Sequence, residues 1–302
     1  GTKSIRHYER ITVPVRRGSW QAGLSADWGE RVVPYGSNRP PWNGVRALLG
    51  GADRRDYLER EGGGAAFTLS HRSGFGVAAG FETAHERSIG GRVDFAIVDK
   101  IDRFNAPVGD GADRAATLGV SWSPEGTSRL RASLGARLAG GALGGDFEYA
   151  RTDASLRYRR HVIGRHEGIL SIGFVTVGGN PPVQRLADIG GLSTVRGYDR
   201  RSRVGETSLA GRLEYPLPYN VLARARVPLL RHLSLQPVTW ADAGRVWRGS
   251  ADSALYSFGV GLQLYFGPFG AASNLRFDIS FPRGAGRTDD VRYDLHFVAA
   301  TF

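Results

Sequence analysis

The sequence contains no cysteine, which excludes a disulfide framework, a thiolate nucleophile and any metal site built on thiolates. It also lacks a run of 18 consecutive apolar residues, so no segment can cross a membrane as an α-helix. The first residues show no basic segment followed by an apolar one, and we expect that any secretory signal has already been removed. Strands that cross a membrane are not excluded by this, because apolar and polar residues alternate along them and their mean hydropathy stays low.

Motifs of common hydrolases are missing as well. There is no Gly-x-Ser-x-Gly elbow and no His-Glu-x-x-His pair. The seven histidines are scattered, and the pairs His85–Glu86 and His166–Glu167 are neighbours at the level of chance. We therefore expect no enzyme activity, no cofactor and no metal, and keep a lipase that uses serine and histidine as a minor alternative.

The net charge of +11 indicates attraction to anionic partners such as lipid headgroups. A nucleic-acid interface would require clustered basic residues, whereas these arginines are dispersed at alternate positions. We expect contact with membrane lipid, including anionic lipid, and no nucleic-acid partner.

Apolar residues alternate with polar or small residues over many segments of about 9–11 residues, which is the period of a β-strand. A soluble sandwich and a membrane barrel both produce this pattern. The segments are long enough to cross a bilayer when tilted, and aromatic residues such as Trp20 and Trp28 stand at segment ends. These two features favour a barrel with its apolar face outward and its arginine-rich face toward a hydrated lumen.

We predict an all-β fold, a transmembrane antiparallel β-barrel that forms one domain over residues 1–302. About twelve strands are expected, over 10–28, 57–71, 75–86, 113–123, 128–139, 146–160, 167–177, 206–215, 233–246, 254–266, 274–282 and 290–302. The long outer loops include residues 178–205. Because the expected number of strands is even, both termini are predicted on the periplasmic side. Pro14 lacks an amide donor, which suits a seam between the first strand and the last strand, which ends at Phe302.

Three motifs follow one another in the C-terminal half. Residues 190–198 read Gly-Gly-Leu-Ser-Thr-Val-Arg-Gly-Tyr, Glu214 lies in Arg-Leu-Glu-Tyr-Pro, and Asp242 lies in Trp-Ala-Asp-Ala-Gly-Arg-Val-Trp. In this order they resemble the superfamily of outer-membrane barrels that insert or export proteins, to which BamA, TamA and FhaC belong. The resemblance covers roughly residues 165–302.

The resemblance implies that Arg196 folds into the lumen and pairs with Glu214 and Asp242. A guanidinium stays charged and offers bidentate geometry to carboxylates, so it can fasten a loop there. Gly197 would permit a tight turn beside it, and Tyr198 completes the motif. The alternative is an exposed loop arginine. Other expected lumen-lining residues either favour anionic solutes or brace the wall: Arg129, Arg131, Arg137, Arg157, Arg276 and Asp278.

Full members of the superfamily carry periplasmic POTRA modules and sixteen strands. Here nothing before residue 8 could form such a module and about twelve strands are expected, so the resemblance is to a branch that lacks POTRA modules. It implies a bacterial outer-membrane location and a role in inserting or moving polypeptide or lipid through a weak lateral seam. A second copy of the chain or a separate periplasmic protein would be a further partner. A passive pore or structural barrel stays open as the main alternative.

Overall fold

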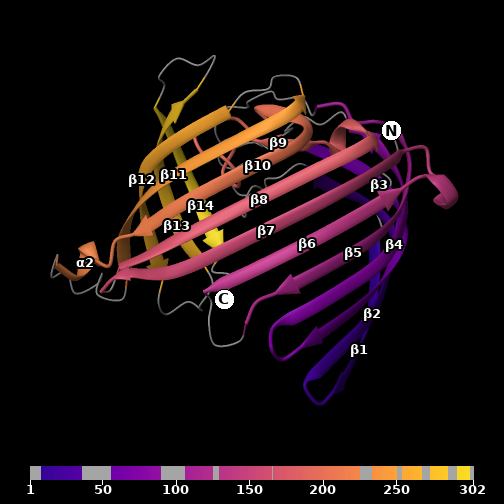
Figure 1. Cartoon of the computed structure of the whole chain (residues 1–302), viewed down its shortest axis with the longest axis horizontal. Helices are drawn as coiled ribbons and strands as arrows, with labels where there is room; N and C mark the ends of the chain where they lie inside the picture. Colours follow the sequence, from indigo (N-terminus) through magenta and orange to yellow (C-terminus); the bar gives the residue numbers. More distant parts are fainter. Residues whose placement is uncertain are drawn as a thin grey trace.

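The structure of the chain is a computed structural model that describes residues 8–35, 56–89, 106–124, 129–164, 166–224, 233–249, 254–266, 273–284 and 291–299. Within these ranges the chain is almost entirely antiparallel β-structure, arranged as one curved sheet (Figure 1). In the same ranges, no helix has both the length and the apolar character needed to cross a membrane.

Fourteen strands form the sheet. They are β1 (Tyr8–Arg17), β2 (Trp20–Tyr35), β3 (Asp56–His71), β4 (Phe75–Ser88), β5 (Gly111–Trp122), β6 (Leu130–Ala139), β7 (Glu148–Ile163), β8 (His166–Asn180), β9 (Ala187–Ile189), β10 (Arg203–Pro216), β11 (Leu233–Gly249), β12 (Ala254–Phe266), β13 (Ser273–Arg283) and β14 (Arg292–Ala299). The described residues also form three short helices, η1 (Gly141–Leu143), η2 (Val183–Arg185) and α2 (Val221–Arg224). Strands pair with their neighbours in sequence, except that β9 lies off this path and pairs only with β10.

The predicted strand number was too low at the N-terminal end and in the loop before β10. Residues 10–28, expected to form one long strand, belong to the hairpin of β1 and β2. The turn consists of Gly18 and Ser19, and Gly18 takes the positive φ of 59° that it requires. The apolar positions are odd-numbered in β1 and even-numbered in β2, so this change of phase marks the turn in the sequence. The short β9 gave no periodic signal.

The barrel-like antiparallel architecture is confirmed, but the predicted closure is not observed among the described residues. There, β1 and β14 are the two edges of the sheet and do not pair with each other. Without β9, the path holds thirteen alternating strands, so β1 and β14 run in the same direction and could not close as an antiparallel pair. For the same reason β1 starts and β14 ends on opposite sides of the sheet, so the even strand number from which both termini were predicted on one side is wrong (Figure 1).

The two residues expected at the seam have different outcomes. Pro14 lies in the edge strand β1, where it stands opposite Gly23 of β2, as the missing amide donor predicts. Phe302 lies outside the described residues.

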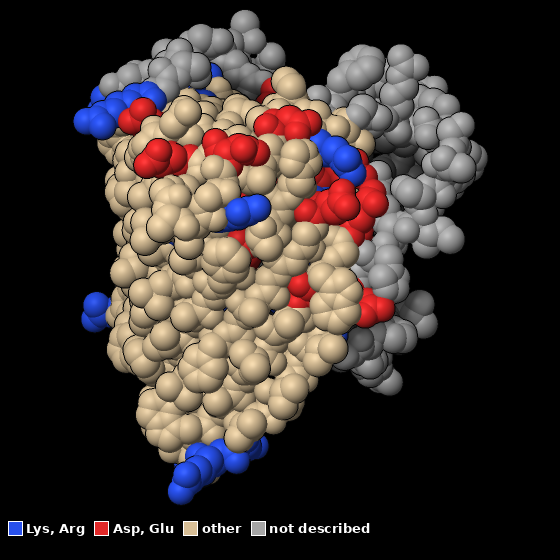
Figure 2. Space-filling model, turned by 90° about the vertical axis from the view of Figure 1, so that its right-hand side faces the viewer, with Lys and Arg blue, Asp and Glu red and all other residues tan. Residues whose placement is uncertain are grey.

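The distribution of apolar and charged residues over the two faces of the sheet is the reverse of that in a soluble protein. On its outer face Leu24, Leu134 and Leu213 are each more than half exposed, whereas Asp113 and Asp278 on the inner face are fully buried. Figure 2 shows a broad uncharged surface on the wall, with acidic residues near its upper rim and basic residues at its lower tip. Such an outer surface suits hydrocarbon rather than water.

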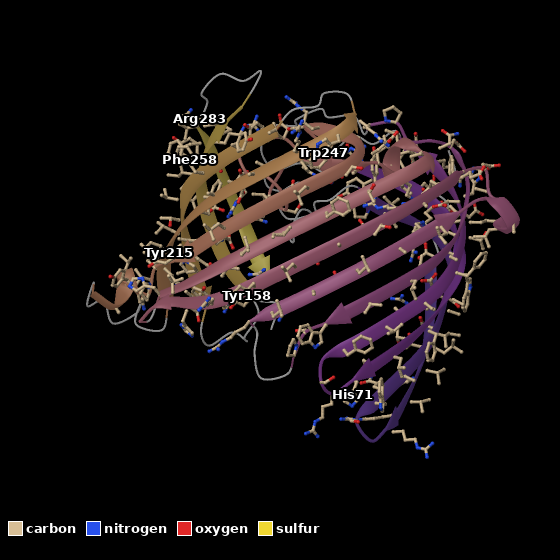
Figure 3. All side chains as sticks on the ribbon, in the orientation of Figure 1. His71, Tyr158, Tyr215, Trp247, Phe258 and Arg283 are labelled. Atoms are coloured by element: carbon tan, nitrogen blue, oxygen red, sulfur yellow. The ribbon has the colours of Figure 1, made fainter. Side chains whose placement is uncertain are left out.

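Aromatic residues gather toward the ends of the strands. Tyr158 and Tyr215 lie near the lower ends, and Trp247 and Phe258 near the upper ends (Figure 3). Phe258 stacks on Phe281 of β13, with ring centroids 5.4 Å apart. Two aromatic bands separated by an aliphatic belt are typical of strands that cross a bilayer.

Candidate functional site: a loop fastened to the inner wall

The loop between β8 and β10 covers residues 181–202, since β8 runs to Asn180 and β10 begins at Arg203. It is therefore slightly shorter than the predicted loop of residues 178–205. Its strand β9 pairs with the start of β10, from Ala187 opposite Gly205 to Ile189 opposite Arg203. Ile189, Val195 and Arg196 have almost no exposed surface, so the loop packs against the inner wall rather than projecting from the rim.

Arg196 is held by two carboxylates. Its Nε and Nη2 donate to the two oxygens of Asp242 on β11, both over 2.7 Å, and its Nη1 donates to Oε1 of Glu214 on β10, also over 2.7 Å. Its backbone amide donates to Asp242 Oδ2 over 3.0 Å, and its guanidinium lies 3.8 Å from the centroid of the Trp240 ring. We call Arg196, Glu214 and Asp242 the Arg196 lock.

Arg276 and Asp278, both expected to line the lumen, extend the Arg196 lock to β13. Arg276 donates to Glu214 Oε1 over 2.8 Å and to Asp278 Oδ1 over 2.9 Å. An Asp278 oxygen lies 3.8 Å from Arg196 Nη1. Buried charges are tolerated only when paired and hydrogen-bonded, so these groups stabilise one another as a set.

The pKa of Arg196 follows from these contacts. Burial alone would lower it, but hydrogen bonds to Asp242 and the negative charges of Asp242, Glu214 and Asp278 outweigh that effect. The pKa of Arg196 therefore lies above its usual value, and the guanidinium stays charged at any physiological pH.

Gly197 and Tyr198 fit the loop to the wall. Gly197 has a φ of 81°, and a Cβ there would stand 2.9 Å from Ser280 Cβ, so both its conformation and the available space demand glycine. The Tyr198 hydroxyl donates to the carbonyl oxygen of Arg283 over 2.6 Å. Burial raises the pKa of Tyr198. Its ring joins an apolar cluster composed of Ile189, Val195, Tyr198, Ala210, Val246 and Leu255.

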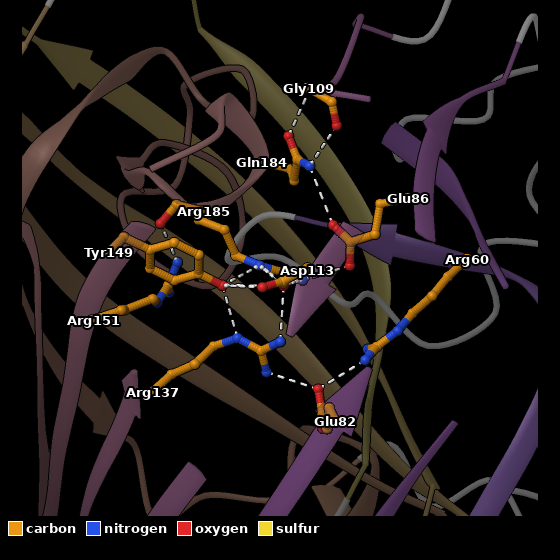
Figure 4. A network of polar contacts seen from close by, with 10 residues as sticks. All are labelled: Arg60, Glu82, Glu86, Gly109, Asp113, Arg137, Tyr149, Arg151, Gln184 and Arg185. Carbon is orange, nitrogen blue, oxygen red and sulfur yellow. Dashed lines mark hydrogen bonds and ion pairs between the residues drawn. The ribbon is translucent and has the colours of Figure 1, made fainter. Parts of the chain in front are cut away.

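A second polar network holds the earlier part of the same loop (Figure 4). Arg185 Nη2 donates to Glu86 Oε1 of β4 over 2.5 Å and to Asp113 Oδ2 of β5 over 2.6 Å. Its Nε donates to the Tyr149 hydroxyl of β7 over 3.0 Å. Gln184 donates to Glu86 and accepts a hydrogen bond from the Gly109 amide over 2.9 Å. Glu86, Asp113, Tyr149 and Gln184 are all buried.

Arg137, predicted to line the lumen, links this network to the neighbouring wall. It donates to Asp113 over 2.8 Å, to Tyr149 over 2.8 Å and to Glu82 over 2.7 Å. Glu82 also accepts from Arg60 of β3 over 2.8 Å. We call the set of Gln184, Arg185, Glu86, Asp113, Tyr149, Arg137, Glu82 and Arg60 the Arg185 network.

The Arg185 network could not be predicted from the sequence as a unit, because its members come from six separate segments and form no motif. One signal was available in Tyr149, an aromatic residue at a position where the alternation calls for an inward polar residue. The register of β7 is continuous across Tyr149 and shifts only between His161 and Ile163 within the described residues. Tyr149 points inward because its hydroxyl belongs to the network.

The remaining predicted lumen residues have separate positions. Arg131 and Arg157 stand opposite each other on β6 and β7. Arg129 is exposed and directly precedes β6, and its carbonyl oxygen accepts a hydrogen bond from the Arg159 amide over 2.6 Å. In the part of the chain that the structure describes, no group of three or more potential metal ligands occurs.

Comparison with solved structures identifies similar folds. BamA from Haemophilus ducreyi lacking POTRA domains 1-3 aligns with a TM-score of 0.61 and 14% identity over 97% of this chain. CdiB from Escherichia coli aligns with a TM-score of 0.57 and 14% identity over 98% of this chain. CdiB from Acinetobacter baumannii gives a TM-score of 0.54 and 15% identity over 97%. The chain has the barrel fold of BamA and CdiB. Protein-family models and curated proteins give no match to the sequence.

This BamA-like chain covers 61% of the Haemophilus ducreyi chain, 53% of the Escherichia coli CdiB chain and 49% of the Acinetobacter baumannii CdiB chain. In the BamA-like fold, the loop of residues 181–202 crosses the inner side of the wall and is fastened at two places. The Arg185 network attaches it to β3, β4, β5 and β7, and the Arg196 lock attaches it to β10 and β11. Mechanically, the loop connects the two halves of an open sheet.

Proposed function

We propose that the protein is a bacterial outer-membrane barrel that inserts or moves polypeptide or lipid through the opening between β1 and β14. The observation that carries the proposal is the Arg196 lock in a fold like that of BamA and CdiB. It joins Glu214 and Asp242, the two partners that the sequence resemblance implies, to the loop that carries Val-Arg-Gly-Tyr. The lock would brace the C-terminal wall while the opposite edge moves.

Among the described residues β1 and β14 are the open edges of the sheet, and these edges support the proposal. An open edge leaves backbone groups unpaired, which is costly in hydrocarbon and favours pairing with another strand. Pro14 removes one donor from β1, which weakens pairing there relative to a central strand. A strand of a client polypeptide, a second copy of the chain or a separate periplasmic partner could each occupy the edge.

A passive pore or structural barrel is the second candidate. The observation that favours it is the pair of networks, because a loop fastened at both ends stabilises a static wall without any client. The two candidates differ in what Arg196 does: an insertase needs the lock for function, whereas a passive barrel needs it only for stability. We propose no catalytic role, and labelling by a serine-directed inhibitor with lipid hydrolysis would overturn that view.

The test is the folding rate of an unfolded barrel client in proteoliposomes that contain anionic lipid. Wild type, Arg196→Ala, the control Arg16→Ala and empty vesicles are compared, with the folded state of each variant checked first. Arg16 is an exposed residue beside the β1–β2 turn. We expect acceleration by wild type and by Arg16→Ala, and its loss in Arg196→Ala. Equal rates for all four samples would refute autonomous insertion, and equal acceleration by all three proteins would refute a functional role for the lock.

A further inference from the structure

An apolar groove with a volume of about 410 Å³ lies on the outer face of the wall, over β10, β11 and β12. Its lining includes three small residues, Gly211 of β10 and Ala241 and Ala243 of β11. Both alanines are exposed, whereas Asp242 between them is buried on the inner side. Gly211 stands opposite Ala243, and a Cβ added at Gly211 would meet no atom within 4 Å. The small residues therefore leave open space in the outer face.

Larger apolar side chains border the groove on two sides. Leu170 of β8 and Leu213 of β10 stand opposite each other on one side. Tyr256 and Phe258 of β12 stand opposite the two alanines of β11 on the other side. All four side chains are exposed on the outer face. An acyl chain laid between them would make dispersion contacts with the sides as well as the floor, which a flat wall does not offer.

Two arginines stand at the upper end of the groove. Arg283 lines the groove and stands opposite Tyr256 in the pairing of β12 with β13, near the upper end of the wall (Figure 3). Arg245 follows the two alanines on the exposed face of β11. The guanidinium of Arg283 lies 5.8 Å from the centroid of the Phe258 ring. That of Arg245 lies 5.5 Å from the centroid of the Trp247 ring. Long cationic side chains beside an aromatic band are typical of the level at which lipid headgroups lie.

We propose that this groove binds a membrane lipid with an anionic phosphate headgroup. The acyl chain lies over Gly211, Ala241 and Ala243, and the phosphate lies at Arg245 and Arg283. The occupant is a lipid because the outer face of the wall suits hydrocarbon, and the two cations select an anionic headgroup by charge complementarity. Guanidinium groups match phosphate oxygens through forked, charge-assisted hydrogen bonds.

The groove lies directly behind the Arg196 lock. Asp242 of the lock lies between the two alanines of the groove floor and faces the opposite way. The Tyr198 hydroxyl donates to the carbonyl oxygen of Arg283 over 2.6 Å and lies 3.2 Å from that of Tyr256. A lipid in the groove and the loop of residues 181–202 thus contact the same strands from opposite faces. The site does not depend on the insertion proposal, because a passive barrel with the same wall would carry it.

Native mass spectrometry of the full chain in non-ionic detergent tests the site through the affinity for the first bound lipid. Phosphatidylglycerol and phosphatidylcholine with identical acyl chains are compared, after circular dichroism has shown that each variant is folded. We expect wild type to bind phosphatidylglycerol about tenfold more tightly than phosphatidylcholine. The double variant Arg245→Gln/Arg283→Gln should lose this preference. Gly211→Leu, which fills the groove, should bind both lipids about tenfold more weakly.

Two control variants separate the groove from general contact with lipid. Arg114→Gln removes an exposed cation of β5, and Ala79→Leu enlarges an exposed residue of β4 that stands opposite Leu118. Both should bind the two lipids as wild type does. The proposal is overturned if wild type binds the two lipids equally, or if either the double variant or Gly211→Leu binds phosphatidylglycerol as tightly as wild type.

A soluble phosphate compound is a different source of the same headgroup chemistry. Glycerol 3-phosphate carries the phosphate without acyl chains, so it should not displace phosphatidylglycerol at an equal concentration. Displacement at that concentration would show that the phosphate alone is recognised and would overturn the assignment to a lipid.

Thermal unfolding distinguishes lipid binding from a change in the stability of the wall itself. In phosphatidylcholine vesicles Gly211→Leu should melt close to wild type, because the space beside Gly211 is open. Adding phosphatidylglycerol should raise the melting temperature of wild type and of Ala79→Leu more than that of Gly211→Leu. Equal increases in all three proteins would contradict the proposal.

Discussion

Arg185 and Arg196 belong to the same loop but bind opposite halves of the sheet. Arg185 donates to Asp113 of β5, and Arg196 donates to Asp242 of β11. Both carboxylates are buried, and each is bound by more than one nitrogen of its arginine or its neighbours. The loop is therefore a strap between two walls rather than a plug attached at one point.

Replacing Arg196 should reveal how much the buried pair depends on its geometry. Arg196→Ala leaves Asp242 buried without its main partner, which should cost about 3–5 kcal/mol of unfolding free energy. Arg196→Lys should recover only part of this loss, because an ammonium cannot bind both oxygens in the plane of the carboxylate. Urea unfolding in lipid vesicles measures both variants.

The control for that series is Arg248→Ala. Arg248 is 81% exposed and lies 3.7 Å from Glu206, so its removal should change stability by less than about 1 kcal/mol. Equal losses for Arg196→Ala and Arg248→Ala would show that the Arg196 lock contributes no more than a surface ion pair.

Gly197→Ala should destabilise the protein by about 1–3 kcal/mol, because the new Cβ forces a strained backbone and a close contact with Ser280. Gly211 of β10 offers a matched comparison: its φ is not positive, and a Cβ there meets no atom within 4 Å. Gly211→Ala should therefore be close to neutral. The melting temperatures of the two variants check the prediction, and similar values would refute it.

Tyr198 predicts a stability loss at alkaline pH. Because burial raises its pKa above the ordinary value of about 10, its stabilising contribution is fully present below pH 10 and is lost as the pH rises through the raised value. Arg196, whose pKa is also raised, stays charged over this interval. The difference in unfolding free energy between wild type and Tyr198→Phe should be constant at neutral pH and change only above pH 10. A difference that changes between pH 6 and 9 would contradict this assignment.

The sequence predicted the strands well where alternation was regular and turns were long enough to interrupt it. The expected strand 254–266 matches β12, and residues 57–71 match β3 to within one residue. The hairpin at Gly18 escaped detection because its turn of two residues leaves only a short break in the pattern, although the apolar positions change from odd to even numbers across it. The open edge also escaped, because the pairing of β1 with β14 depends on the direction of every strand between them.

The two halves of the strap differed in how readily they could be predicted. The contacts of Arg196 followed from three motifs whose order resembles a known superfamily, and Arg276 and Asp278 followed from alternation alone. Arg185 does not lie in a recognisable sequence motif. Its partners Glu86 and Asp113 lie side by side only when β4 and β5 are paired in the sheet. Long-range convergence of this kind is not encoded in local spacing.

Hydrogen–deuterium exchange of the loop, followed by mass spectrometry, tests the strap most directly. Wild type, Arg185→Ala and Arg196→Ala are compared in the same lipid vesicles, with Arg248→Ala as the control. We predict that Arg185→Ala speeds exchange around residues 183–189, that Arg196→Ala speeds it around residues 193–199, and that wild type and control protect both segments. Unchanged protection of residues 183–189 in Arg185→Ala, or uniform loss over the whole loop in either variant, would contradict two separate points of attachment.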